Sequence, residues 1–223
     1  MDIFFDLLPM ILGTALAPAW VIIVLLILRN QNGLVKAIAF VIGTTVVRLL
    51  QGVIFGYLLR NAKGIEEANG SSPVVSVLLA VLGILLLISA VKKLINEEDP
   101  DAPPPKWIST FEQATPLALL AAGAVSTLIA PKLWVFTLST IGIILGADLN
   151  PWDTFKTYFL YTLAAQTLLI LPLLLCAIAP HQSARILQSI SDWLTQNKKP
   201  ITLLVSLVFG SYFLWKGLSG LLA

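Results

Sequence analysis

Long apolar runs alternate with short polar segments along the whole chain, and this pattern predicts an all-α fold. A helix needs roughly 17 to 25 mainly apolar residues to cross a bilayer, and six runs reach that length. We therefore expect a polytopic membrane protein with six transmembrane helices. The expected spans are Phe4–Leu28, Val35–Leu59, Val74–Val91, Leu117–Leu145, Thr154–Ala179 and Pro200–Leu222.

An acidic, proline-rich segment separates the six spans into two groups of three. Residues 97–113 begin with the sequence EEDPDAPPP, which cannot continue a helix and is typical of a linker. We therefore expect a first three-helix repeat at residues 1–96 and a second at residues 114–223. Because three is odd, the two groups must have opposite orientations in the membrane, which predicts inverted repeats.

The segment before the last span has a different pattern. Pro180–Asn197 is mostly polar, with apolar residues at Ile186, Leu187, Ile190 and Trp193. This spacing predicts a short amphipathic helix that lies on the membrane surface.

The positions of the Lys and Arg residues predict the orientation of the spans. The loops after spans one, three and five carry Arg29, Lys36, Lys92, Lys93, Lys106, Arg185, Lys198 and Lys199. The opposite side carries Arg60, Lys63, Lys156 and Lys216. By the positive-inside rule, the linker is cytoplasmic and both termini lie outside. The expected location is a bacterial-type inner (plasma) membrane.

Composition supports the membrane prediction and excludes several functions. Only 12% of the 223 residues are charged and 57% are hydrophobic, whereas soluble domains are about 25% charged. The net charge of +2 and the lack of a basic run among aromatic residues argue against a nucleic-acid partner. The single cysteine, Cys176, excludes an internal disulfide.

Several spans contain residues that are costly near the middle of a bilayer. Proline removes a backbone donor, and a charge at the bilayer centre costs about 2.5–3.5 kcal/mol on insertion scales. Polar groups at that depth face a bundle interior or a wet cavity, because lipid cannot satisfy them. The expected helix-breaking residues are Pro18 and Pro131, and the expected substrate-binding residues are Arg48, Gln51, Lys132 and Gln166.

A purely structural role stays open for each of these residues. Buried glutamines often form only helix–helix hydrogen bonds, and cations can bond to freed carbonyls or extend to the interface. Their occurrence at a similar depth in both halves favours a shared polar site.

The charge of the expected site predicts its ligand. Arg48 and Lys132 are cationic, and no Asp or Glu lies well inside a span. A helix that begins at Pro131 could add amide donors and a positive dipole end. A carboxylate, phosphate or sulfate group would therefore fit. Clustered metal ligands and a nucleophile–base pair are missing, so we expect no metal site, no cofactor and no enzyme activity.

Three short motifs resemble the LysE-type exporter superfamily. The sequence APKLWVF at residues 130–136 is similar to that superfamily's Asn-Pro-Lys motif, with Ala130 in place of Asn. Pro18 stands where lysine-exporter members have Pro-Gly-Pro, and Ala19 and Trp20 replace the Gly-Pro. The sequence GSYFLWKG at residues 210–217 is similar to the Gly-x-Tyr-Leu-x-Trp-x-Gly pattern of the last span.

The resemblance implies two inverted three-span repeats and a transport function. The hydrophobic composition and the acidic linker look closest to the GAP branch (peptidoglycolipid-addressing proteins), which is implicated in moving lipidic or amphiphilic cargo. We therefore expect a secondary exporter of a small anionic or amphiphilic molecule that works by alternating access. The alternative is a non-transporting accessory or lipid-addressing factor for a partner complex. The expected partners of the protein are the lipid bilayer and a small anionic or amphiphilic substrate, and a homodimer stays open.

Overall fold

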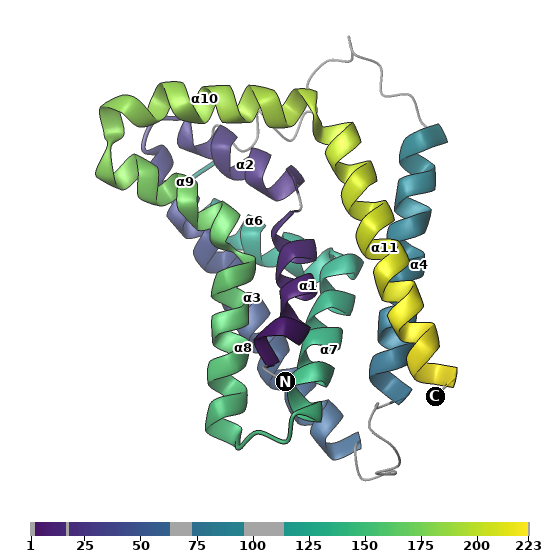
Figure 1. Cartoon of the computed structure of the whole chain (residues 1–223). Helices are drawn as coiled ribbons and strands as arrows, with labels where there is room; N and C mark the ends of the chain where they lie inside the picture. The colour runs from purple at the N-terminus through teal and green to yellow at the C-terminus, as the bar shows by residue number, and fades with distance from the viewer. Residues whose placement is uncertain (1–2, 17, 63–72, 96–113, 223) are drawn as a thin grey trace.

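The computed structural model describes residues 3–16, 18–62, 73–95 and 114–222, and all regular secondary structure in these ranges is helical (Figure 1). The predicted linker, residues 97–113, lies outside the described residues. The helices are α1 (Ile3–Ala15), α2 (Pro18–Leu28), α3 (Gly33–Ala62), α4 (Pro73–Ile95), α6 (Pro116–Ile129), α7 (Pro131–Gly146), α8 (Pro151–Ala165), α9 (Thr167–Ile178), α10 (Pro180–Gln196) and α11 (Lys198–Leu222).

Within the described ranges, three helices are long and apolar enough to cross a membrane alone: α3, α4 and α11. Three further helix pairs meet the same criterion together but are bent. The bends are 55° between α1 and α2, 72° between α6 and α7, and 65° between α8 and α9. The all-α membrane prediction is therefore confirmed for this part of the chain, with up to six spans if each bent pair is counted as one.

Two of the bends are explained by proline. Pro18 is the first residue of α2 and Pro131 is the first residue of α7. Proline suits this position because the first backbone N–H groups of a helix have no partner within it.

The third bend is at a residue that is neither proline nor glycine. Gln166 ends α8 and precedes α9, with φ −100° and ψ 5°. A proline in the same span, Pro172, would favour a kink, but it lies inside α9, and the bend is instead at Gln166. The backbone N–H of Gln166 still bonds to the carbonyls of Thr162 and Leu163, and the helix direction changes only after it.

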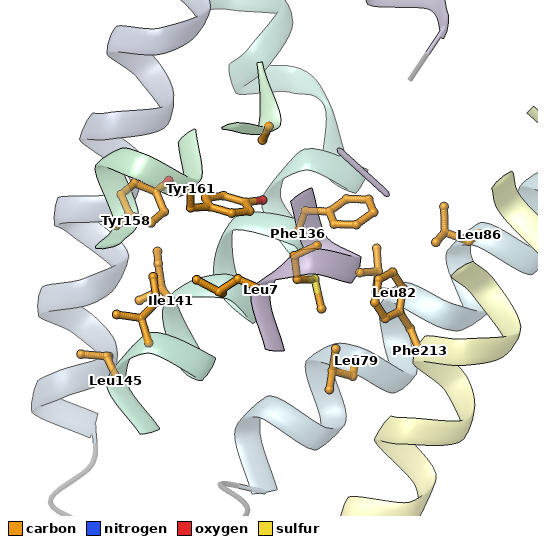
Figure 2. Packing of buried hydrophobic residues seen from close by; sticks show 13 residues of the cluster. Leu7, Leu79, Leu82, Leu86, Phe136, Ile141, Leu145, Tyr158, Tyr161 and Phe213 are labelled. Atoms are coloured by element: carbon orange, nitrogen blue, oxygen red, sulfur yellow. The ribbon is translucent and has the colours of Figure 1, made fainter. Parts of the chain in front are cut away.

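The buried apolar residues form two clusters. The first apolar cluster, shown in Figure 2, comprises Leu7, Met10, Leu79, Leu82, Leu86, Phe136, Ile141, Ile144, Leu145, Tyr158, Tyr161, Ala165 and Phe213. The second apolar cluster comprises Val21, Val24, Leu25, Ile27, Ala37, Phe40, Val41, Leu119, Leu169, Leu173 and Leu187. Each bent pair gives one helix to each cluster, so the three breaks lie at the boundary between the clusters.

Helices α4 and α11 pack very closely against each other. A Cβ atom at Gly83 would lie 2.5 Å from the backbone N of Leu214, and one at Gly217 would meet the backbone of Ala80. Small residues permit such an approach of two membrane helices, which is then held by van der Waals contact. Figure 1 shows the two helices side by side at one edge of the molecule.

The predicted surface helix is present as α10, which lies across one end of the bundle in Figure 1. Leu187 and Ser191 on this helix are buried. Ile186, Ile190 and Trp193 form an exposed apolar stripe beside that buried face. The helix therefore has a protein-facing side, an apolar exposed side and a polar side, as expected for a helix at a membrane interface.

Candidate functional site

Polar side chains lie buried or half-buried where the two apolar clusters meet, and two of them, Tyr158 and Tyr161, also belong to the first apolar cluster. They come from α1, α3, α8 and the α8–α9 break, and direct hydrogen bonds link several of them. We call this group the polar belt. Its members are Thr14, Thr45, Arg48, Gln51, Tyr158, Tyr161 and Gln166.

One face of α3 contacts α8 and the break that follows it. The Thr45 hydroxyl lies 2.8 Å from Oε1 of Gln166 and 2.7 Å from the backbone carbonyl of Val41, and its single proton is shared between these two acceptors. The Tyr158 hydroxyl donates a 2.8 Å hydrogen bond to the backbone carbonyl of Arg48. Gly52 lies one turn further along α3, where a Cβ atom would collide with the Tyr158 ring. The spacing of Thr45, Arg48 and Gly52 places all three on one side of the helix.

A second contact joins α1 to α8. The hydroxyl oxygens of Thr14 and Tyr161 are 3.2 Å apart and share a hydrogen bond. The ring centroids of Tyr158 and Tyr161 are 5.9 Å apart, and Figure 2 shows these rings roughly in a row with that of Phe136. The polar belt therefore directly joins the first span, the second span and the fifth span.

Arg48 is a buried cation, and the ion pairs shown for the described residues do not include it. Its side chain is only 7% exposed and its Nε atom has no hydrogen-bond partner. Tyr158 and Tyr161 lie within its electrostatic range. The ion pairs that the structure shows in the described ranges, Lys156–Asp153 and Lys216–Asp6, do not include Arg48. A buried cation without an anion is costly.

The amide groups nearby also have unused hydrogen-bonding capacity. Neither Nε2 nor Oε1 of Gln51 has a partner, and Nε2 of Gln166 has none either. Both side chains are at least nine-tenths buried. Buried polar atoms in native structures usually have a partner, so unpaired ones indicate a water, ion or ligand position. Three of the four unpaired atoms, counting Arg48 Nε, are donors, which favours an acceptor-rich or anionic ligand.

The α6–α7 break is stabilised by Trp134. The indole Nε1 donates a 2.7 Å hydrogen bond to the backbone carbonyl of Leu128, on the other side of the break. In a continuous helix, the N–H four residues later would take this bond. The Trp134 ring also lies 5.5 Å from that of Phe55, centroid to centroid. Trp134, in the first turn of α7, thus contacts α3 at Phe55, which is about 10 Å along the axis of α3 from Arg48.

The structure brings some of the predicted site residues together. Arg48, Gln51 and Gln166 are all buried in the polar belt. Pro18 and Pro131 are at helix starts, as expected for helix-breaking residues. The backbone of Lys132 is in the first turn of α7, but its side chain lies outside the described part of the structure. That Lys132 and Arg48 together bind one anionic group therefore stays a prediction.

Sequence analysis did not identify Thr14, Thr45, Tyr158 or Tyr161. A signal for the two tyrosines was available, because polar side chains recur in α8 at intervals of three and four residues. Tyr158, Tyr161 and Thr162 are all on the buried side of that helix, and this period is typical of one helical face. In the described ranges, no group of three or more His, Cys, Asp or Glu side chains could hold a metal ion.

A family comparison covers almost the whole chain. The model of the family described as Sap, sulfolipid-1-addressing protein, matches residues 7–219. The chain belongs to the Sap family. No curated protein and no solved structure matches it. The Sap match agrees with an integral membrane protein, while the finer resemblance to LysE-type exporters and to the GAP branch stays a prediction.

Proposed function

We propose that the chain is a transporter that binds an amphiphile with an anionic head group at the polar belt and exports it by alternating access. The observation that carries this proposal is Arg48, a buried cation at the boundary of two apolar clusters with an unpartnered Nε. Arginine is well suited to a sulfate, phosphate or carboxylate because its donors form a fork that matches these groups.

An amphiphile fits this position better than a small hydrophilic anion. The unpaired donors of Arg48, Gln51 and Gln166 offer hydrogen bonds to a head group. The apolar clusters on both sides of the polar belt offer contacts for hydrocarbon. The Sap family is named for addressing a sulfolipid, and a sulfated lipid combines both properties.

The broken spans support transport. Discontinuous helices near the membrane midplane are typical of secondary transporters, where their free ends face the substrate. The first and fourth spans are both broken next to a proline, and the third and sixth are each a single helix. This correspondence supports inverted halves, although α3 is a single helix while its counterpart, the α8–α9 pair, is bent. In the exporter, Lys132 at the start of α7 would supply a second cation.

The second candidate is a lipid-addressing factor that presents the amphiphile to a partner complex without moving it across the membrane. The hydrogen bonds Thr14–Tyr161 and Tyr158–Arg48 favour it, because they tie three spans together. Passage of a head group would require these contacts to open, whereas presentation to a partner would not.

Purified protein in liposomes tests both candidates. The probe is a fluorescent sulfated glycolipid, with an uncharged glycolipid of the same chain length as the control, and a membrane-impermeant quencher reports movement between leaflets. The exporter predicts faster movement of the sulfated probe, its loss in Arg48→Gln, and normal movement in Arg60→Gln, which removes an exposed cation.

Two further results separate the candidates. Stabilisation by the sulfated lipid without movement would support the addressing factor. Neither stabilisation nor movement would overturn both proposals. Lys132→Ala should abolish movement while the protein still inserts into membranes, and normal movement would remove Lys132 from the proposed mechanism.

A further inference from the structure

A second feature suited to lipid lies on the outer surface of α4, away from the polar belt. A furrow with a volume of about 440 Å³ is lined by Ile84, Leu87, Ile88, Val91 and Lys92. The volume is within the range of small-molecule sites, about 300–1,000 Å³. Four of the five lining residues are apolar, and they extend over two turns of the helix.

The furrow runs beside the contact between α4 and α11. Leu87 lines it and also packs against Gly210 of α11, where a Cβ atom would lie 3.0 Å from the Leu87 side chain. Ile84, Ile88 and Val91 are each about half exposed, so this face is open to the hydrocarbon of the bilayer. An acyl chain could therefore lie along this face of α4, beside its contact with α11.

Lysines gather at one end of the furrow. Lys92 lines the furrow itself and is exposed. Lys93 follows it and is within electrostatic range of Lys198 and Lys199 at the start of α11. Figure 1 shows the end of α4 and the start of α11 at the end of the bundle where α10 lies. Four cations from two helix ends thus lie where the amphipathic α10 indicates the membrane interface.

We infer that Lys92, Lys93, Lys198 and Lys199 and the α4 furrow form a binding site for an anionic phospholipid of the bilayer. The lysines contact the phosphate-bearing head group, and the furrow holds part of an acyl chain. Each Lys or Arg near an anionic membrane surface contributes about 1 kcal/mol of attraction. By the predicted orientation this end is cytoplasmic, and anionic lipids are abundant in that leaflet.

Lipid retention by the full-length protein tests this site. The protein is purified in a mild detergent, mixed with dioleoyl phosphatidylglycerol or dioleoyl phosphatidylcholine, and analysed by native mass spectrometry. Wild type should retain the anionic lipid preferentially. The variant Lys92→Gln/Lys198→Gln/Lys199→Gln should bind phosphatidylglycerol at least about tenfold more weakly, given the contribution of each lysine. Soluble glycerol phosphate should not compete, because it has no acyl chain.

Two matched variants keep the inference falsifiable. Arg60→Gln/Lys156→Gln/Lys216→Gln removes three cations elsewhere on the chain and should leave retention unchanged. Ile88→Trp fills the furrow at an exposed position without changing charge and should weaken retention. Equal loss in both triple variants would show a general charge effect and overturn the site. Undiminished retention in the lysine variant would also overturn it. Because the furrow is on α4 and Arg48 is on α3, the lysine variant should lose the same amount of retention in an Arg48→Gln background, so this test does not depend on the polar belt.

Discussion

The Thr45 hydroxyl donates a 2.8 Å hydrogen bond to the side-chain carbonyl of Gln166, 121 positions later in the chain. This bond attaches the second span to the bend of the fifth span. It also fixes the Gln166 amide so that Nε2 remains unpaired in the polar belt. The bend and the candidate site therefore depend on the same contact.

Replacing Thr45 with Val should destabilise the protein by about 1–3 kcal/mol, because the buried Oε1 of Gln166 loses the hydroxyl proton that it shares with the Val41 carbonyl. Denaturant unfolding in detergent measures this change. Thr195→Val is the matched control, since Thr195 is exposed and its hydroxyl bonds to the carbonyl of Ser191 in its own helix, α10. In the double variant Thr45→Val/Gln166→Leu both partners are apolar, so the combined cost should be smaller than the sum. If the loss of unfolding free energy in the double variant equals the sum of the losses in Thr45→Val and Gln166→Leu, the bond contributes nothing to stability.

Replacing Arg48 with Met should leave the protein equally stable or stabilise it by about 1–4 kcal/mol, because an apolar side chain of similar length removes an uncompensated buried charge. The same change should abolish stabilisation by the sulfated lipid. Thermal unfolding with and without this lipid measures both effects. Arg60→Met, at an exposed position, controls for loss of charge. A large loss of stability in Arg48→Met would indicate a structural role for the guanidinium group.

Two glycines on α3 should respond differently to replacement by Ala. A Cβ atom at Gly52 would overlap the Tyr158 ring, whereas one at Gly56 would have its nearest neighbour, Ile141, at 3.9 Å. Gly52→Ala should destabilise by about 1–3 kcal/mol through overpacking. Gly56→Ala should stabilise by roughly 0.5–1 kcal/mol through helix propensity. Unfolding midpoints that shift in the same direction would contradict the close packing of α3 and α8.

Replacing Trp134 with Phe should destabilise the α6–α7 break. The aromatic contact with Phe55 would remain, but the exposed Leu128 carbonyl would lose a donor that lipid cannot replace. The expected cost is about 1–3 kcal/mol. Hydrogen exchange of the residues flanking Pro131 should become faster as well. Trp215→Phe is a suitable control because Trp215 is 68% exposed. Equal effects of the two variants would show that the indole N–H is not required at the break.

The apolar runs and the first two breaks could be predicted from the sequence because each has a local cause. The length of an apolar run predicts a span. Proline clashes with the preceding helical turn and has no backbone N–H, so Pro18 and Pro131 begin helices whatever their neighbours are. Burial of Arg48, Gln51 and Gln166 was also predictable, because lipid cannot satisfy these groups.

The bend at Gln166 was not predictable, because no residue there breaks a helix by itself. Its side chain is held by Thr45, a contact between distant parts of the chain. Pro172 gave a stronger local signal but lies within a continuous helix. Thr14 and Tyr161 were missed for the same reason: their partnership becomes evident only when α1 packs against α8.

The glycine contact between α4 and α11 restricts how the molecule can change shape. At Gly83 and Gly217 even an added methyl group would collide with the backbone of the facing helix, so sliding of one helix past the other would force bulkier side chains into these positions. We therefore expect the two helices to move as one rigid body. If the protein opens toward either side of the membrane, we expect the movement to occur at the breaks of the three bent pairs, α1–α2, α6–α7 and α8–α9. A crosslink between α4 and α11 should then not impair it.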